Sequence, residues 1–321
     1  MLQIKEQRCT VCDKEDSTIR SYGGRDYCET HIHLFYEDSR ELWQACILTF
    51  GSIIVTIISS AIFSILAPSD LSGTSLPVAG MIASVIPGVV WIVSLYRYGR
   101  LWNGAISPLV PIVSVTGILS AAAISHPFSN NLIGLGLWLT KTTALNRLLG
   151  DILLGGLFHT YVIFMIVRIA GWTHATFYNR VTGITLTLAV TVGYSTMLCL
   201  MYVFDSGGLL VLSGNLRLVS MLCSLIAPGL VLGYFVGISR FEDLPFTQLT
   251  IGFGSAAALN GLLTYISTET GYVGLSLTQN GFSPWPGAVI CMVITIGTFI
   301  AVYGLIQRQN HIAQARIEPS Q

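Results

Sequence analysis

The stretch Cys9-Thr-Val-Cys12 is followed after fifteen residues by Cys28-Glu-Thr-His31, and the chain becomes almost continuously apolar from Ala45 onward. Each pair has two intervening residues, so the chain can turn and direct both donor atoms at one ion. A tetrahedral zinc ion is bound by four such donors, and two short-spaced pairs supply them without a large hydrophobic core. The sequence therefore predicts a small metal-bound head followed by a large membrane body.

The segment between the two pairs is suited to a hairpin. Tyr22-Gly-Gly-Arg25 contains two glycines, which tolerate the positive φ that tight turns require. Cys28 and His31 follow at the start of a predicted helical stretch that runs to about Trp43, where residues i and i+3 share a face. Four protein ligands leave no open coordination position, so we expect the zinc ion to be structural. The predicted ligands are Cys9, Cys12, Cys28 and His31, with His33 as a substitute, unless these are unrelated residues of a short polar leader.

This outline resembles a treble-clef or zinc-ribbon finger, and we assign residues 1–44 to it and its linker helix. Residues 45–307 form a predicted transmembrane helical bundle and residues 308–321 a cytoplasmic tail. Only 10% of the 321 residues are charged and the mean hydropathy is +0.68, whereas soluble domains carry roughly 25% charged residues. We therefore expect an all-α polytopic membrane protein with about eight transmembrane helices and an N-terminal zinc finger. Runs of about twenty apolar residues place the spans near 45–67, 75–96, 105–124, 148–171, 183–204, 216–237, 248–266 and 285–306.

Two regions do not fit this pattern cleanly. Pro108 and Pro111 interrupt the first turn of the third predicted span, and residues 133–139 are apolar but too few to cross a bilayer. The short run is expected to be interfacial or re-entrant.

The distribution of basic residues predicts the orientation. If the head is cytoplasmic, the inside loops hold most of the arginines, so both termini are expected in the cytoplasm. A reducing compartment also keeps the head cysteines available as metal ligands. We predict that the other four cysteines are buried core residues. The inside set is Arg97, Arg100, Arg168, Arg180, Arg240, Arg308 and Arg316, against Lys141, Arg147 and Arg217 outside.

Ionisable residues inside a membrane are costly, so each one is a candidate site. Asp151 and His159 lie on the fourth predicted span, on the same side of the helix but about 12 Å apart along its axis. They could form part of a proton relay or metal site, but simpler explanations exist. Asp151 could pair with Arg147 one turn earlier, the interpretation that we favour, and His159 could bond to a hydroxyl or carbonyl of a neighbouring helix. Asn260 lies among small residues and is expected to hydrogen-bond across a close helix contact.

Several classes of function are disfavoured. The formal net charge is zero and no basic stripe with interleaved aromatic residues occurs, so nucleic-acid binding is not expected. The sequence contains no G-x-S-x-G, H-E-x-x-H or P-loop motif. We expect Asp205, Glu242, Asp243 and Glu269 to lie in loops, which leaves Asp151 without a second acid for two-carboxylate hydrolysis.

Four apolar segments carry a resemblance to a known family. The proline-containing stretch 85–100 and the glycine-patterned stretches 182–202, 227–237 and 249–260 resemble the helices of PrsW-type intramembrane proteases. The resemblance spans about residues 75–270 and implies a bacterial inner membrane. It also implies that catalytic glutamates should align near Phe158, His159, Leu198 and Cys199, and a histidine at Asn260, but none of the expected acids is present.

The missing acids favour a catalytically inactive relative. The first hypothesis is therefore a non-enzymatic membrane protein, an accessory or assembly subunit that binds other membrane proteins, with the zinc finger as a cytoplasmic contact module. The second is a divergent PrsW-like peptidase that uses His159 and Asp151 with an unrecognised partner. The third is a small-solute transporter, for which the Pro108 and Pro111 segment is the one broken-helix candidate.

Overall fold

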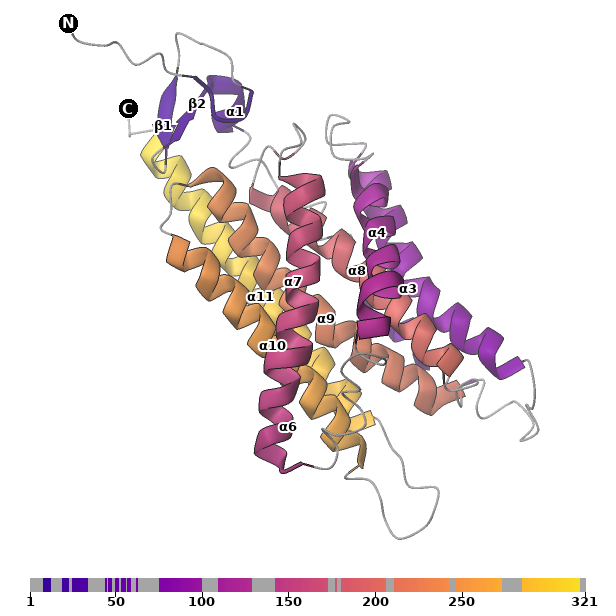
Figure 1. The fold of residues 1–321 in the computed structure, drawn as a ribbon. Helices are drawn as coiled ribbons and strands as arrows, with labels where there is room; N and C mark the ends of the chain where they lie inside the picture. The colour runs from indigo at the N-terminus through magenta and orange to yellow at the C-terminus, as the bar shows by residue number, and fades with distance from the viewer. Residues whose placement is uncertain are drawn as a thin grey trace, which may run out of the picture.

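The computed structural model shows a small α/β head at one end of a bundle of long helices, and the C-terminal end of the last helix lies at the same end (Figure 1). The residues that it describes are 8–12, 19–22, 25–33, 75–99, 109–128, 142–172, 177, 180–205, 211–242, 246–272 and 285–317, with scattered positions between 44 and 62.

The head is built on the predicted hairpin. Strands β1 (Arg20–Tyr22) and β2 (Arg25–Tyr27) pair antiparallel, with Arg20 opposite Tyr27 and Tyr22 opposite Arg25. Helix α1 (Glu29–His33) follows directly. The rest of the predicted helical stretch toward Trp43 lies outside the continuously described residues.

Where they are described, the helices of the bundle coincide with predicted spans, and most continue past one or both of the predicted ends. Five of them are long and apolar enough to cross a membrane: 144–171, 180–205, 214–241, 247–269 and 285–312. Two apolar stretches are shorter, 80–91 and 109–125, so the count of eight spans stays a prediction. The first predicted span, 45–67, is described only at scattered positions, and residues 133–139 lie outside the described part. The bounds are α3 Ser75–Gly99, α4 Leu109–Ser120, η1 Ala121–Ser125, α6 Ala144–Gly150, η4 Asp151–Gly156, α7 Leu157–Ile166, η5 Val167–Gly171, α8 Arg180–Asp205, α9 Val211–Phe241, α10 Phe246–Tyr272 and α11 Trp285–Ile317.

The described part of helix α4 begins at Leu109, so Pro111 lies near that end, whereas Pro108 lies outside the described residues. The π-helical segment η1 continues it, and η4 and η5 are π-helical segments within the single long helix 144–171.

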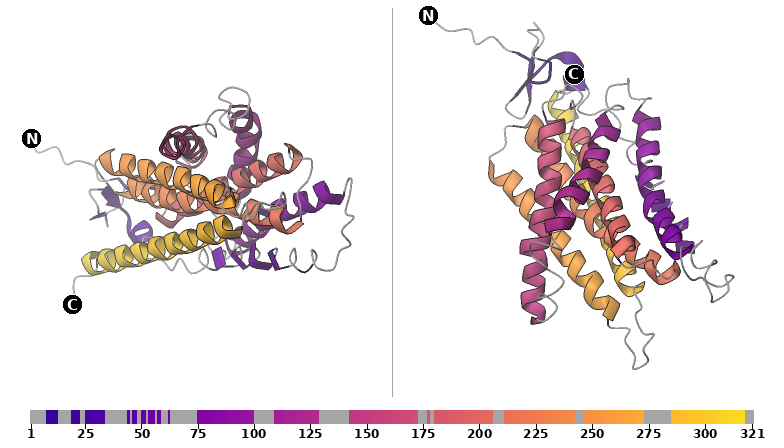
Figure 2. Two further views of the ribbon diagram at one scale, coloured as in Figure 1. Left: turned by 90° about the horizontal axis from the view of Figure 1, so that it is seen from below. Right: turned by 45° about the vertical axis from the view of Figure 1, so that its right-hand side comes forward.

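Helices α8 and α9 form the centre of the bundle. In each, 78% of the span is buried, against 22% for α11 at the periphery. Figure 2 shows α11 along one side of the bundle, away from α7. The α8–α9 contact is close because Gly183 faces Gly237: a Cβ on Gly183 would lie 2.5 Å from the Cα of Gly237. Small residues allow helix backbones to approach in this way.

Helix α8 carries a row of buried threonines that the apolar surroundings do not solvate. Thr185, Thr187 and Thr191 each donate a hydrogen bond to the carbonyl four residues earlier, at 2.7–3.0 Å. Their hydroxyl groups are therefore satisfied within the helix itself. The four cysteines outside the head, Cys46, Cys199, Cys223 and Cys291, are all buried, as predicted.

Candidate metal centre

The four predicted ligands come together in the head. The ligand atoms of Cys9, Cys12, Cys28 and His31 all lie within 4.8 Å of one another. The His31 Nδ1 atom lies 3.0 Å from the Cys28 Sγ atom and 3.6 Å from the Cys9 Sγ atom, and the Cys12 and Cys28 sulfurs are 3.9 Å apart. The cluster can hold a metal ion. The side chain of the substitute ligand, His33, lies outside the described part of the structure.

These distances suit a tetrahedral ion. With metal–sulfur bonds of about 2.3 Å and a metal–nitrogen bond of about 2.0 Å, neighbouring donors of a tetrahedron lie about 3.5–3.8 Å apart. The 3.6 and 3.9 Å separations fall close to that range. The Cys28–His31 pair would move slightly apart, and the widest separation, up to 4.8 Å, would shorten by about 1 Å to close on one ion. Four protein donors occupy all four positions, so the arrangement suits a structural ion.

Backbone contacts hold the two ligand pairs against each other. Thr10 follows the first ligand, and its N–H donates to the carbonyl of Asp26 on β2 at 2.8 Å. On the other side, the N–H groups of His31 and Ile32 both donate to the carbonyl of Cys28 at 3.0 Å, which forms the turn that returns the imidazole toward its own cysteine. The hairpin and α1 thus position the pairs as the spacing predicted.

The thiols of the cluster differ in acidity. Burial raises the pKa of Cys9, but backbone hydrogen bonds from Cys28, Cys12 and Val11 outweigh that effect and leave the pKa below its ordinary value. Burial raises the pKa of Cys28 to about 11. Metals bind thiolates, so the lowered pKa makes Cys9 the more readily ionised of these two ligands. The Cys28 thiol, with its raised pKa, loses its proton only when the metal ion displaces it.

The head is packed onto the bundle, which the sequence did not reveal. The ring of Tyr27 is fully buried and its hydroxyl group donates to the carbonyl of Phe241 at the end of α9. The guanidinium of Arg25 donates to the carbonyl of Arg240. Tyr27 and Ile32 belong to the same hydrophobic core as the bundle residues around Phe241. Burial holds the pKa of Tyr27 above its ordinary range, so the hydroxyl group stays a donor.

His159 has the simple environment that the sequence favoured. Its Nδ1 atom lies 2.5 Å from the hydroxyl group of Tyr194 on α8, and that hydroxyl group donates to the Oγ atom of Ser125, also at 2.5 Å. The imidazole of His159 and the tyrosine hydroxyl group are thus hydrogen-bond partners. Phe158 and Phe128 stack beside it, with ring centroids 4.0 Å apart. The prediction that a neighbouring hydroxyl group satisfies His159 is confirmed.

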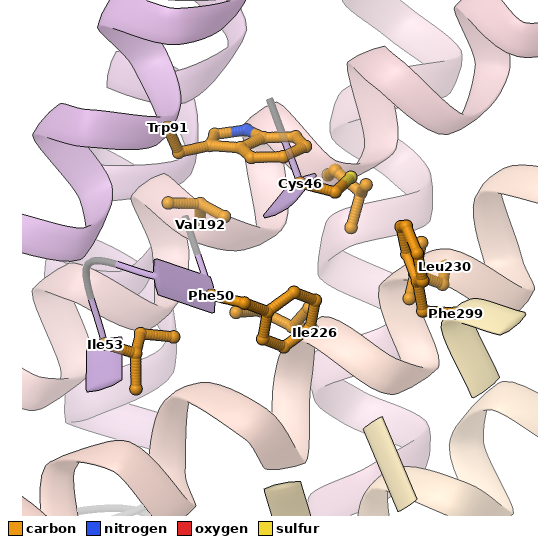
Figure 3. Close-up of a pocket in the computed structure, with 9 residues that line it drawn as sticks. Cys46, Phe50, Ile53, Trp91, Val192, Ile226, Leu230 and Phe299 are labelled. Atoms are coloured by element: carbon orange, nitrogen blue, oxygen red, sulfur yellow. The ribbon is translucent and has the colours of Figure 1, made fainter. Parts of the chain in front are cut away.

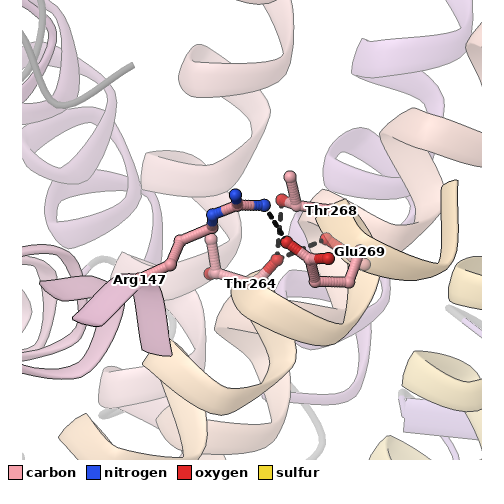
Figure 4. Close-up of polar contacts among 5 residues, drawn as sticks. Arg147, Thr264, Thr268 and Glu269 are labelled. Atoms are coloured by element: carbon pink, nitrogen blue, oxygen red, sulfur yellow. Dashed lines mark hydrogen bonds and ion pairs between the residues drawn. The ribbon is translucent and has the colours of Figure 1, made fainter. Parts of the chain in front are cut away.

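The predicted pairing of Asp151 with Arg147 is wrong. Arg147 forms its ion pair with Glu269 on α10, as Figure 4 shows, although its charge still acts on Asp151. Glu269 was expected in a loop, but α10 continues past the predicted end at residue 266 to Tyr272. The longer helix carries the carboxylate into reach of Arg147, and an interhelical pair replaces the intrahelical one. Among the described residues, Asp151 and His159 are not brought together.

The other carboxylates also have structural partners. Asp205 is the last residue of α8 rather than a loop residue, and its Oδ2 atom lies 2.9 Å from the Nε2 atom of His126. Glu242 directly follows α9 and pairs with Arg180 at 2.6 Å. Asp243 lies outside the described residues. Asp205 and Glu242 thus each connect the end of one helix to another part of the bundle.

Asn260 lies at a close helix contact, but its bond is not the expected one. Its Oδ1 atom accepts from Thr264 within α10 at 3.5 Å, and the buried Nδ2 atom has no hydrogen-bond partner within the described structure. The close contact is made by its neighbour: a Cβ on Gly261 would lie 2.4 Å from the Cα of Ile152. The small residues therefore serve backbone approach, as predicted, whereas a hydrogen bond from Asn260 across that contact is not seen.

A pocket lies between α3, α8, α9 and α11, and Figure 3 shows its lining. Its lining side chains are apolar, with Trp91 and Phe299 among them. The thiol of Cys46 and the indole N–H group of Trp91 are the polar groups among its lining side chains, which include no carboxylate, imidazole or amine.

In the comparison with known proteins, no protein-family model, no curated protein and no solved structure matches this chain.

Proposed function

We propose that this chain is a non-enzymatic integral membrane protein that binds other membrane proteins as an accessory or assembly subunit. The observation that carries the proposal is a row of small residues on the outer face of α11: Gly297, Ala301 and Gly304, all exposed. A Cβ added to Gly297 or Gly304 would meet no atom within 4 Å. We call this row the α11 small-residue face.

Elsewhere the same chain uses such residues to bring helices together. A Cβ on Gly156 would lie 2.2 Å from the carbonyl oxygen of Ala257, and Gly183 lies against Gly237. The α11 small-residue face has the i, i+4, i+7 spacing of a helix-packing surface and no partner among the described residues. Helix association in a bilayer depends on close packing, so a transmembrane helix of another protein is the occupant that this face fits.

The interior polar residues support a role without catalysis. His159 is hydrogen-bonded to Tyr194, which in turn bonds to Ser125, and Arg147 forms an ion pair with Glu269. A hydrolytic mechanism needs a base that can reach a water or a nucleophile, and an imidazole committed to a structural hydrogen bond is poorly placed for it. The PrsW-like peptidase and the small-solute transporter are therefore the weaker alternatives.

We further propose that the ion of the head is zinc, with a structural role. Three cysteines and one histidine form a donor set typical of structural zinc. The head end also carries Arg168, Arg180 and Arg240, which supports a cytoplasmic location for that end and for both termini. A cytoplasmic head fixed to α9 by Tyr27 would present its outer surface to a partner in a constant orientation.

The test replaces Gly297 and Gly304 together by leucine and measures the mass of the complex extracted in mild detergent from native membranes. We expect the wild type to extract with a second, different membrane protein, and the double variant to extract alone. The control is Ile300→Leu, an exposed position of similar depth with no small residue to lose. Extraction of the wild type as a monomer, or as copies of itself alone, contradicts the proposal.

A further inference from the structure

We propose that Arg25, Arg168 and Arg240, with Trp172 between them, form a binding site for the phosphate headgroup of an anionic phospholipid. We call the three arginines the arginine cluster. They come from three separate parts of the chain: β2 of the head, the π-helical segment η5, and the last turn of α9.

Contacts with one indole ring and one carbonyl group hold the cluster together. The Arg168 guanidinium lies 4.0 Å from the centre of the Trp172 ring, and that of Arg240 lies 5.6 Å from it. Arg25 donates to the backbone carbonyl of Arg240, which brings the third guanidinium alongside. The charges of Arg25 and Arg168 both act on Arg240, so each of the two lies close enough to repel it.

This repulsion is not offset by an acid within the described structure. The nearby carboxylate, Glu242, pairs with Arg180, whose side chain is buried. At the opposite end of the bundle the arginines do have internal partners: Arg147 pairs with Glu269, and Arg217 donates to Ser267 at 3.0 Å. Like charges gathered without a counter-charge favour an anion from outside the chain.

The position of the cluster favours a lipid over a free anion. Arg168 and Arg240 lie at the ends of two candidate membrane spans, 144–171 and 214–241, the depth at which headgroups lie. Trp172 is a residue type enriched at that depth. Ile169, the residue after Arg168, is 71% exposed, so apolar surface for an acyl chain is available at the same end of this helix. A phosphate diester that carries acyl chains satisfies both surfaces at once.

The experiment uses the full-length protein in mild detergent, titrated with phosphatidylglycerol and, separately, with zwitterionic phosphatidylcholine, with bound lipid counted by native mass spectrometry. We expect the wild type to bind phosphatidylglycerol preferentially. An interfacial arginine contributes about a fivefold effect, so Arg168→Gln with Arg240→Gln should weaken this binding roughly 25-fold, and Arg25→Gln about fivefold. Phosphatidylcholine binding should not change.

Arg308→Gln is the matched control, because it removes one exposed arginine from the last part of α11 outside the cluster. It should bind phosphatidylglycerol as the wild type does. Size-exclusion profiles and thermal unfolding check that each variant is folded. If the double glutamine variant does not fold, Arg168→Lys with Arg240→Lys takes its place. This lysine variant keeps both charges and should keep the preference for phosphatidylglycerol, whereas Arg25→Gln should weaken it. Equal binding by the wild type and the cluster variants overturns the proposal, as does an equal loss in Arg308→Gln. Complete competition by inorganic phosphate at millimolar concentration overturns the assignment to a lipid.

Discussion

Replacing Gly237 by alanine should loosen the centre of the bundle. A Cβ at this position would lie 2.2 Å from the carbonyl oxygen of Arg180, and contacts below 3.0 Å are essentially never seen. The obstacle is backbone rather than a flexible side chain. Helices α8 and α9 would therefore have to separate locally by about 0.8 Å or more, against a tightly packed core.

Overpacking of this kind costs roughly 1–3 kcal/mol. For a chain of 321 residues the unfolding entropy is about 0.7 kcal/mol/K, so we expect the midpoint of thermal unfolding to fall by roughly 1.5–4.5 °C. The measurement is thermal unfolding in detergent, followed by circular dichroism or by intrinsic fluorescence. Gly183→Ala, on the opposite side of the same contact, should show a loss of similar size because its Cβ would meet the backbone of Gly237 at 2.5–2.6 Å.

Gly254→Ala is the control. Gly254 also lies within a helix, but a Cβ there would meet no atom within 4 Å. Alanine is the better helix former by up to about 1 kcal/mol, so this variant should be as stable as the wild type or slightly more so. Unchanged stability of Gly237→Ala, or an equal loss in Gly254→Ala, would refute the argument that the backbone contact sets the cost.

Three other changes test the head and the far end of the bundle. Cys12→Ser should lower bound zinc, measured by mass spectrometry of the metal, from about one ion per chain to near zero; unchanged zinc would reject the site. Tyr27→Phe removes the hydroxyl group that donates to the Phe241 carbonyl and should weaken docking of the head onto the bundle by about 1–3 kcal/mol. Faster hydrogen exchange in β2 would show this; unchanged exchange would mean that the hydroxyl group does not stabilise the docked head. Glu269→Gln leaves Arg147 without its counter-charge and should cost about 1–2 kcal/mol of stability; thermal unfolding measures it, and a stabilised variant would contradict the pairing.

The metal ligands could be predicted because their chemistry is local. Cys9 and Cys12, and Cys28 and His31, are close in sequence, and the intervening glycines indicate the hairpin that brings the pairs together. The approximate helix positions were also predictable, since a bilayer demands long apolar runs whatever the neighbours are. The environment of His159 followed from the same rule, because a buried polar group needs a partner.

Contacts between distant segments could not be predicted. Docking of Tyr27 onto Phe241 joins residues more than two hundred positions apart, and nothing in either local pattern indicates the other. The error at Arg147 has a similar cause. The sequence places Asp151 one helical turn away, whereas Glu269 comes within reach because α10 continues beyond its apolar run. Tertiary proximity, rather than spacing, decides such pairs.

The π-helical segments have a consequence for how the long helix 144–171 meets its neighbours. Each π turn accommodates one residue more than an α turn, so residues on either side are rotated relative to an uninterrupted helix. Gly156, at the end of η4, faces Ala257, while Gly171, at the end of η5, faces Leu186 of α8. A single long helix can thereby present one glycine to α10 and another to α8, so that both neighbours approach it closely at different points along its length.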